Sequence, residues 1–427
     1  MPHPAPTVPS ERIQALDTIR GFALLGILLM NILAFGLPSR AYFDPSVDGA
    51  LSGADFGVFF VVDLLVEGVM RAVFSMLFGV GIGLATSRET HLRGGGIYYR
   101  RQCWLLGIGL VDTFVLLWTG DILVSYALAG MVLYVCRNWR PRNLGIAAGC
   151  IFAYLATVYA AIFLVLSWGP VQAEAVQTRI EAGQAVSAED RARLDAWVEL
   201  QAAVHPPESI RAREALKFEG SYRQSFVANA EEAGEMYILF LPVFAIWDAA
   251  ACMLLGMALY KTGFFQGLYS LRRYTLVAIL GFACGLTVNG FELTVKIGSG
   301  YAPEWVSGAS VFTNDLGRVS MALEFVCVAM IAWQCNWFAR PRRVLAAVGR
   351  MALTNYILQS VFGLVIFHDF GLGLWNELAR HQLYYIVLAE WIVLIWFSSW
   401  WLGRYRFGPL EWLWRSLTYG RVQPMAA

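Results

Sequence analysis

Ten apolar runs, each close to the length of a membrane-crossing helix, dominate the chain. A bilayer needs about 20 apolar residues per helix, and a helix satisfies its backbone polar groups without water. Only 15% of the 427 residues are charged, against about 25% in soluble proteins. We therefore expect an all-α, polytopic integral membrane helix bundle of about ten transmembrane helices. The runs cover roughly residues 19–37, 60–86, 98–118, 121–136, 143–168, 236–260, 274–296, 311–337, 344–367 and 382–402.

The positions of the arginines predict the orientation of the bundle. With the amino terminus inside, the short outer loops hold only Arg40 and Arg380, whereas the inner segments hold 18 arginines and Lys261. The positive-inside rule then places both termini in the cytoplasm. Residues 55–86 are long enough for two crossings, but two crossings would move Arg88 and Arg93 outside. We therefore expect one tilted crossing there, preceded by an interfacial or re-entrant piece.

Two segments do not have membrane character. Residues 170–235 hold 12 acidic and 7 basic residues and predict a small extracytoplasmic helical cap. After Pro409, the residues Leu410, Leu413, Trp414 and Leu417 share one helical face, which predicts an interfacial amphipathic helix. The expected organisation is a membrane bundle over 1–169, an extracytoplasmic insertion over 170–235, a second membrane bundle over 236–403 and a cytoplasmic interfacial helix with a tail over 404–427.

Composition favours the bilayer as partner over metals or nucleic acid. The seven cysteines are scattered and contain no Cys-x-x-Cys, and the five histidines lack metal-ligand spacing, so we predict no metal site. A net charge of +1 gives no reason to expect nucleic acid. Gly145-x-x-x-Gly149 and Gly281-x-x-x-Gly285 are helix-packing motifs, through which a homodimer could form.

Charged residues inside the spans are the first candidates for a site, because a charge in the hydrocarbon zone costs several kcal/mol. Glu67 and Arg71 are four residues apart and Asp315 and Arg318 are three apart. Each pair could therefore neutralise itself within one helix. This spacing is compatible with an ion pair that only stabilises the bundle and also with a site.

Arg350 has no acidic residue nearby in its own span, so it must find a partner on another helix or line water. Asn355 and Gln359 extend Arg350 into a polar stripe, which fits interhelical hydrogen bonds and a ligand groove equally well. We expect Arg318 and Arg350 to lie close to acidic side chains of other spans, with Glu324, Asp248 and Glu67 as the nearest candidates.

Six blocks of sequence carry a family resemblance: residues 11–21, 26–31, 74–81, 120–123, 349–356 and 407–415. They resemble the YeiB-type family of bacterial inner-membrane proteins. Because they extend from residue 11 to 421, the resemblance covers nearly the whole chain and implies a bacterial inner-membrane location. The opening Leu16-Asp17-Thr18-Ile19-Arg20-Gly21 is also similar to that of transmembrane acyltransferases. Those enzymes pass an acyl group from a cytoplasmic donor to an acceptor at the outer face.

The resemblance to acyltransferases implies a donor side and an acceptor side. Asp17 and Arg20 would order the inner mouth, and Arg318 or Arg350 would hold donor phosphates or polarise the carbonyl. The expected co-substrate is an acyl-CoA, with no firmly bound cofactor.

On the acceptor side, an extracytoplasmic glycan or small molecule would receive the acyl group. The similar enzymes carry a His at the end of the first helix, where this chain has Asn31. An amide cannot be a general base, so Asp121 would take that role. Asn31 would orient the substrate or stabilise an oxyanion.

Two other functions remain open at this point. The chain could carry a small anionic metabolite, with buried arginines as the binding site and acidic residues as proton couplers, or it could be a non-catalytic scaffold. An enzyme needs one cavity joining both faces, whereas a carrier needs a central site closed on one side. Our catalytic candidates are Asp121, Asn31, Arg318 and Arg350, and our substrate-binding candidates are Asp17, Arg20, Glu67, Arg71, Asp248, Glu324, Asn355 and Gln359.

Overall fold

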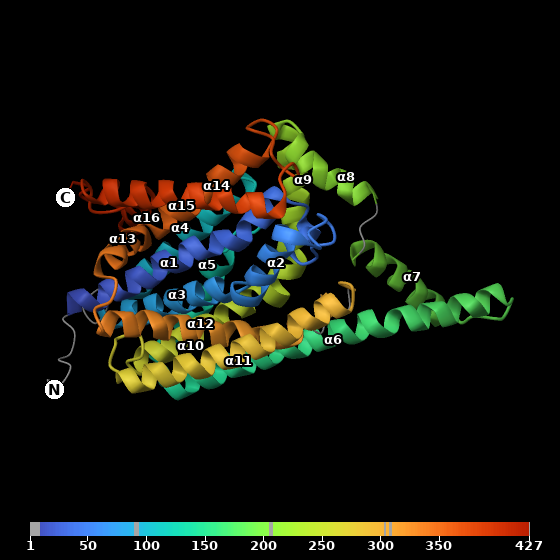
Figure 1. Cartoon of the computed structure of the whole chain (residues 1–427), viewed down its shortest axis with the longest axis horizontal. Coiled ribbons are helices and arrows are strands. Elements are labelled where there is room, and N and C mark those ends of the chain that lie inside the picture. The colour runs from blue at the N-terminus through green and yellow to red at the C-terminus, as the bar shows by residue number, and fades with distance from the viewer. Residues whose placement is uncertain (1–8, 89–93, 205–207, 303–304, 307–309, 427) are drawn as a thin grey trace.

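The apolar runs become helices that lie along one common axis, as Figure 1 shows. The computed structural model describes residues 9–88, 94–204, 208–302, 305–306 and 310–426. Apart from connections and an isolated β-bridge between Tyr405 and Ala426, the elements in these ranges are helical, which confirms the all-α prediction. The first half of the chain contains α1 (Pro9–Gly36), η1 (Ser39–Tyr42), α2 (Gly53–Leu65), α3 (Val69–Arg88), α4 (Gly94–Phe114), α5 (Leu123–Leu133), η3 (Tyr134–Asn138), α6 (Pro141–Glu181), α7 (Ala188–Val204) and α8 (Glu208–Glu219).

The second half continues the helical pattern to the carboxyl terminus. Its elements are α9 (Tyr222–Glu235), the π-helical η4 (Met236–Ala245), α10 (Ile246–Lys261), α11 (Leu271–Gly298), α12 (Ser310–Gln334), α13 (Ala339–Arg350), α14 (Ala352–Phe367), α15 (Arg380–Leu402) and α16 (Pro409–Tyr419).

The lengths and compositions of these helices make the chain a polytopic membrane protein. Among the described residues, six helices are long and apolar enough to cross a bilayer, and a seventh is added if α13 and α14, bent by 78°, form one broken span. The expected runs over 60–86 and 121–136 are helical but divided or short, since α2 has 13 residues and α5 has 11. The ten-crossing topology therefore stays a prediction.

Both the start of α1 and the last helix, α16, lie at one end of the bundle (Figure 1). Trp414 of α16 donates its indole N–H to the carbonyl of Arg101 at 2.9 Å, next to the start of α4. At the end of α10, Lys261 donates to the carbonyls of Arg137 and Trp139 at 2.6 and 2.7 Å. We call this the basic end, and the opposite end, which carries α7, α8 and α9, the cap end.

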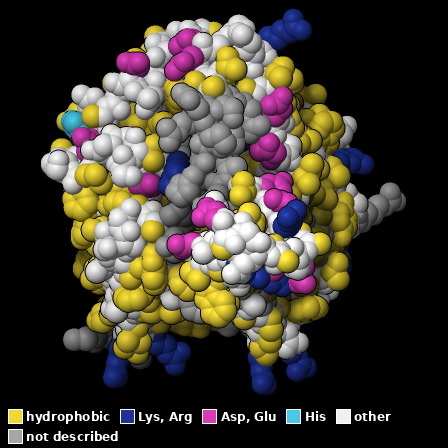
Figure 2. Space-filling view, turned by 90° about the vertical axis from the view of Figure 1, so that its right-hand side faces the viewer, with side chains coloured by type: hydrophobic (Ala, Val, Ile, Leu, Met, Phe, Trp, Pro, Cys, Tyr) yellow, Lys and Arg dark blue, Asp and Glu magenta, His cyan; other side chains and the backbone are white. Residues whose placement is uncertain are grey.

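The cap end differs from the flanks of the bundle in chemistry. Figure 2 views this end and shows acidic side chains gathered around its centre, with hydrophobic side chains covering the flanks. Phe218 of α8 stacks on Trp375, with ring centroids 4.9 Å apart, and its carbonyl accepts a 2.9 Å hydrogen bond from the backbone of Asp369. These contacts dock α8 onto the connection between α14 and α15.

Helices continue through residues 170 and 235, where we expected the extracytoplasmic insertion to begin and end. Helix α6 continues through Pro170 to Glu181, and the helical stretch from Tyr222 to Lys261 passes through 235. The change from apolar to charged residues occurs within continuous helices, because a helix keeps its own hydrogen bonds whether lipid or water surrounds it.

Glycines allow the closest helix crossings. A Cβ at Gly79 of α3 would lie 2.0 Å from the carbonyl oxygen of Met253 in α10, so only glycine fits there. The space beside Gly281 of α11 is also occupied, since a Cβ there would lie 2.7 Å from the carbonyl oxygen of Ser320 in α12. The Gly281 motif thus packs within the chain. Nothing among the described atoms lies within 4 Å of a Cβ built at Gly145, so that motif keeps an open face.

Candidate functional site

A break between α2 and α3 places two carboxylates in the interior of the bundle. Helix α2 ends at Leu65, and α3 begins after Gly68, whose φ of +69° suits glycine because it has no Cβ. Lys296 of α11 reaches into this break, with Nζ 2.9 Å from Asp63 Oδ1 and 3.2 Å from Glu67 Oε2. The Lys296 side chain is only 4% exposed. Two carboxylates therefore share one buried lysine.

These three residues are one half of a group of charges that we call the charge cluster. Its other half joins α3, α10 and α12 and consists of Arg71, Asp248, Asp315 and Arg318. Arg318 donates from Nε to Asp315 Oδ1 at 2.9 Å and also forms an ion pair with Asp248. Arg71 Nη2 lies 3.6 Å from the other Asp248 oxygen. Whereas the Arg318 side chain is 2% exposed, that of Arg71 is 43% exposed, although its neighbours in α3 are buried. Accessible space therefore adjoins the Arg71 guanidinium.

These contacts confirm one expectation about the arginines and correct another. Arg318 pairs with Asp248 from another span, as expected, and with Asp315 in its own helix. Glu67 and Arg71 do not neutralise each other as one helical pair: Glu67 binds Lys296 and Arg71 binds Asp248. The physical reason is the break at Gly68, which ends the regular four-residue spacing between them.

A second group of acidic residues lies between α4 and α5 and has no basic partner in the part of the chain that the structure describes. Asp112 of α4 is fully buried, and neither of its oxygens makes a hydrogen bond of good geometry to the described part of the chain. Its polar neighbours are the Asp121 carboxyl and Ser360. Asp121 accepts the backbone N–H of Val124 at 2.8 Å with one oxygen, which caps α5. Its other oxygen makes no hydrogen bond of good geometry to the described residues, and its polar side-chain neighbours are Asp112 and Tyr356. We call Asp112 and Asp121 the carboxyl pair.

The cap helices close over this carboxyl pair. Thr113, next to Asp112, shares a 2.7 Å hydrogen bond with the hydroxyl of Tyr237, and its carbonyl accepts a 2.8 Å bond from the Asn229 amide. Lys217 of α8 bonds to Glu232 of α9 at 2.7 Å. The carboxyl pair is thus covered by hydrogen-bonded polar groups of α8, α9 and η4.

Asn31 lies on the part of α1 that approaches the α4–α5 connection. One turn beyond it, Phe35 packs on Trp118 of that connection with ring centroids 4.1 Å apart. The Asn31 side chain is half-buried. The structure therefore brings the helix that carries Asn31 next to the loop that carries Asp121.

Residues expected at the inner mouth lie at the basic end. Arg20 donates to Asp17 at 2.8 Å. Arg350, the last residue of α13, is exposed and donates to the carbonyl of Arg406 at 3.2 Å. Arg350 has an acidic neighbour from another span, as expected, but that neighbour is Asp17 of α1 and not one of the three candidates named. The bend after α13 places Arg350 at the surface and not in the interior of the bundle.

The polar stripe of α14 is used for helix packing. Asn355 is fully buried and donates to Ser398 at 2.8 Å and to the carbonyl of Val348 at 3.2 Å. Gln359 donates to the carbonyl of Leu24 at 3.2 Å. These bonds join α14 to α15 and α1, so they favour the interhelical interpretation of the stripe. Glu324 of α12 lies elsewhere, against Gly281 of α11.

Comparison with known proteins shows to which family this chain belongs. The chain is 30% identical to the uncharacterized protein YeiB of Escherichia coli over 97% of this chain and 98% of that protein. The chain belongs to the YeiB family. It is also 28% identical to the uncharacterized protein YxaH of Bacillus subtilis, over 99% of this chain and 98% of that protein. Residues 259–421 match the model of a protein of unknown function, DUF418, and no solved structure matches.

The family segment 259–421 contains Lys296, Asp315 and Arg318, whereas their partners Asp63, Glu67 and Asp248 lie before it. The charge cluster of this YeiB-family member therefore joins the two halves of the chain. Within the described residues, no group of three His, Cys, Asp or Glu side chains is placed to hold a metal ion.

The sequence pattern did not predict a further group of polar contacts at the start of α15. His381 at the start of α15 has its Nδ1 2.8 Å from Asp55 Oδ1, and its backbone N–H donates to the same oxygen. The adjacent Arg380 is held by Asp48 at 2.9 Å. Asp55 stands eight residues, or about two helical turns, before Asp63 in the otherwise apolar α2, and this second acidic residue was the signal that could have found it.

Proposed function

We propose that this protein is a membrane-embedded acyltransferase that uses the carboxyl pair as its acid–base group. The observation that carries the proposal is that the buried Asp112 and the half-buried Asp121 lie together with no basic partner among the described residues. Two adjacent carboxyl groups in a low-dielectric site cannot both ionise easily, so they are suited to share and exchange one proton. A purely structural role would not explain why such costly groups are kept there.

In the proposed reaction, an acyl-CoA enters from the basic end and the acceptor hydroxyl comes from the cap end. The ionised carboxylate of the pair takes the hydroxyl proton, and the hydroxyl oxygen bonds to the thioester carbonyl carbon. The C–S bond then breaks, and the thiolate leaves with a proton from the pair. Asn31 supplies an amide N–H to the developing oxyanion.

The donor phosphates fit the basic end better than the charge cluster. Arg350 is exposed there, and Arg20 lies on the same side. Arg318 is already paired with two carboxylates, so we assign it to the stability of the bundle. From Arg20 to Asn31 is 11 residues, or about 16 Å at 1.5 Å per residue, which the thin arm of an acyl-CoA must span.

The test is thioester cleavage by the purified protein in lipid nanodiscs, with acetyl-CoA and a cell-surface glycan as acceptor. We expect free thiol to appear together with acylated glycan, and Asp121→Asn to abolish both. Asp195→Asn, which changes an exposed carboxylate on α7, is the matched control. Acyl transfer at the wild-type rate by Asp121→Asn, or none by the wild-type protein, would remove the proposal.

The proposal includes a topology. It takes ten crossings in a bacterial inner membrane, both termini in the cytoplasm, α7–α9 outside and α16 at the inner interface. The location of arginines at the basic end supports this. A single cysteine introduced at Ala188 of an otherwise cysteine-free chain should react with an impermeant reagent in intact cells; reaction only after lysis would reverse the orientation.

The open face at Gly145 supports a homodimer, which cross-linking through the neighbouring exposed Cys150 would detect.

A carrier for a small anionic metabolite is the second candidate, and the exposed Arg71 favours it. A cation beside accessible space in a helix break resembles the broken-helix sites of transporters. Proteoliposomes should then accumulate a labelled carboxylate, and Arg71→Gln should stop this. Uptake without thioester cleavage would favour the carrier, and cleavage without uptake the enzyme.

A further inference from the structure

The carboxyl pair lies just beneath the flank of the bundle. Val111 and Val115, which stand on either side of Asp112 in α4, are 53% and 49% exposed, as is typical of apolar side chains that face lipid. Asp112 itself is fully buried, and neither of its oxygens makes a hydrogen bond of good geometry to the described residues. A buried carboxyl group without such bonds is rare, and it can bind a polar group of a ligand.

The π-helical segment η4 covers the carboxyl pair on this side through one side chain. Among the described residues, the hydrogen bonds and ring contacts between η4 and α4 all belong to Tyr237. Its hydroxyl shares a 2.7 Å hydrogen bond with Thr113, and its ring meets Phe114 edge-on, with centroids 6.1 Å apart. The carboxyl pair supplies its acidic neighbours. Because Tyr237 is itself half-exposed, it stands between the carboxyl pair and the surface.

The segment η4 is packed less tightly than the helices on either side of it. Helices α9 and α10 bury several residues, whereas η4 buries none. Its π-helical hydrogen bonds span five residues, a rare geometry that is frequent at functional sites. Pro242 lies within η4 and has no N–H to bond to the Tyr237 carbonyl five residues earlier. Segments with so few buried contacts open locally at low cost, so we expect the turn that carries Tyr237 to move more easily than α9 or α10.

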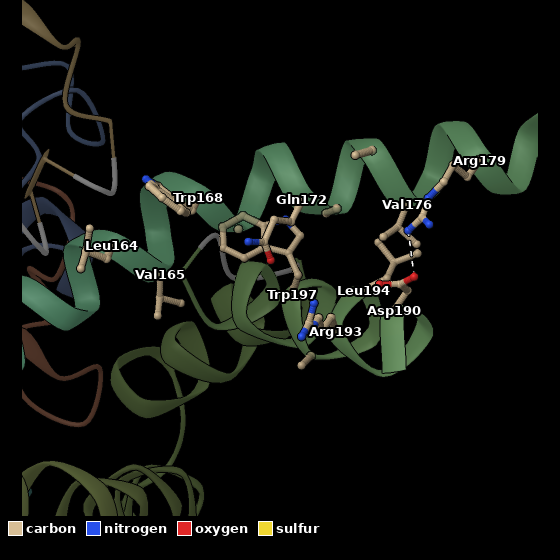
Figure 3. A pocket seen from close by; sticks show the side chains of 14 residues that line it. Leu164, Val165, Trp168, Gln172, Val176, Arg179, Asp190, Arg193, Leu194 and Trp197 are labelled. Atoms are coloured by element: carbon tan, nitrogen blue, oxygen red, sulfur yellow. Dashed lines mark hydrogen bonds and ion pairs between the residues drawn. The ribbon is translucent and has the colours of Figure 1, made fainter. Parts of the chain in front are cut away.

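Neither α6 nor α7 lies over this first turn of η4. Helix α6 contacts the last turn of η4, where Tyr159 stacks on Phe244 with ring centroids 5.2 Å apart. It then continues away from the bundle, and α7 packs against it around Trp168 and Trp197, as Figure 3 shows. In the first turn of η4, Ile238 is 73% exposed. The surface beside Tyr237 is therefore left to the lipid.

We propose that a lipid-anchored hydroxyl compound reaches the carboxyl pair laterally, between α4 and the first turn of η4, when Tyr237 moves away from Thr113. Only a molecule with an apolar anchor is concentrated in the hydrocarbon region from which this route starts. The oxygens of Asp112 need hydrogen-bond donors, and a hydroxyl group supplies one. The movement of Tyr237 also frees the Thr113 hydroxyl to bind the same group.

This route deepens the proposed function, because it makes the acyl acceptor a molecule of the leaflet at the cap end. The identification of the ligand as the acceptor rests on acyl transfer, whereas the route itself does not. A test of access to the carboxyl pair without any acyl donor therefore separates the two. Failure of acyl transfer with acetyl-CoA would leave the result of that test unchanged.

The test compares two carbodiimides on the purified full-length protein in lipid nanodiscs. Dicyclohexylcarbodiimide is apolar and dissolves in the bilayer, whereas a cationic carbodiimide stays in water; each adds as a whole molecule to a protonated carboxyl group. Peptide mass spectrometry gives the rate of addition at Asp112 and Asp121. We expect the apolar reagent to add faster at equal concentration. Faster addition of the cationic reagent, or addition of neither, would overturn the proposal.

Two tyrosine variants test the role of Tyr237. Tyr237→Phe removes only the hydroxyl that bonds to Thr113, so the apolar reagent should add about fivefold faster, as the loss of one hydrogen bond allows. Tyr222→Phe is the matched control, because the Tyr222 hydroxyl also bonds to α4, at the carbonyl of Val115 at 2.9 Å, but belongs to α9. It should keep the wild-type rate. An unchanged or slower rate in Tyr237→Phe, or an equal increase in Tyr222→Phe, would overturn the proposal.

Discussion

The charge cluster and the carboxyl pair hold acidic residues at membrane depth in opposite ways. In the charge cluster, Asp248 is shared by two arginines and Lys296 is shared by two carboxylates. In the carboxyl pair, Asp112 and Asp121 have only polar neutral groups and each other. A buried ion is tolerated when an opposite charge lies beside it. Ion pairing therefore explains the charge cluster as a structural feature, but it does not explain the carboxyl pair.

This difference suggests how to assign the two regions. Removing one partner from a matched group should mainly reduce stability, because a charge is left uncompensated. Changing a member of the unmatched pair should mainly affect chemistry, because no ion pair is lost. The accessible Arg71 is the exception within the charge cluster, since it is the member that could also meet a ligand.

The largest effect on stability should come from Arg318→Ala. This change leaves Asp248 and Asp315 facing each other without the buried guanidinium between them, at a cost of about 3–5 kcal/mol. Thermal unfolding in mild detergent, followed by circular dichroism, measures it. Arg318→Lys, which keeps the charge, should lose less; equal losses for the two variants would mean that packing, not charge, matters at this position.

The same chemical change should have different effects in the two regions. Asp248→Asn should cost about 3 kcal/mol, since it removes the charge that two arginines share. Asp112→Asn should change stability by less than about 1 kcal/mol, because an amide of the same shape replaces a carboxyl that made no ion pair. Unfolding of both variants under one condition gives the comparison. Similar losses would show that the carboxyl pair also stabilises the bundle.

A smaller effect should follow from pH at the point where the cap docks. Burial against Phe218, with Lys217 nearby, lowers the pKa of His368 to about 4. Because the folded pKa is below the usual value of about 6.5, the unfolded segment binds more protons between these values. Docking is therefore fully stable above about pH 6.5 and weakens as the pH falls toward 4. Amide exchange in α8 should rise from pH 7 to pH 5, after correction for intrinsic rates.

The variant His368→Gln is the control for that pH effect. Its amide exchange in α8 should not depend on pH beyond the intrinsic rates, since no titrating group remains at the contact. The same pH dependence in His368→Gln and wild type would assign the effect to another residue of the cap.

Much of the fold follows from the one-dimensional pattern, and so does part of the charge cluster. Long apolar runs specify helices in lipid, and the three-residue spacing of Asp315 and Arg318 predicted their contact. Asp248 was expected near Arg318 because a buried carboxylate without a local partner needs a cation. Family membership was also predictable, since the motifs span the chain.

What the pattern did not predict depends on helix breaks and on pairing between helices. A division of residues 55–86 into two pieces was expected, but its position at Gly68 was not, because glycine carries no side chain whose pattern would reveal it. Lys296 meets Asp63 and Glu67 only because α11 packs beside that break. The bend after Arg350 was also missed, because residues 344–367 are a continuous apolar run without proline, and close packing of Gly349 on the Asp17 carbonyl is a tertiary feature.

The smallest effect should come from Arg350→Ala, and this variant separates the structure from the sequence-based expectation. If Arg350 neutralised a buried carboxylate, its removal would cost about 3–5 kcal/mol, as for Arg318. In the structure its guanidinium is exposed and donates to the carbonyl of Arg406, and its acidic neighbour Asp17 is already bonded to Arg20, so the loss should be below about 0.5 kcal/mol. Unfolding beside Arg318→Ala measures this. At the same time, the proposed donor site predicts weaker acetyl-CoA binding for Arg350→Ala, measured by calorimetry. A large loss of stability would place Arg350 in the interior after all, and an unchanged affinity would remove it from the donor site.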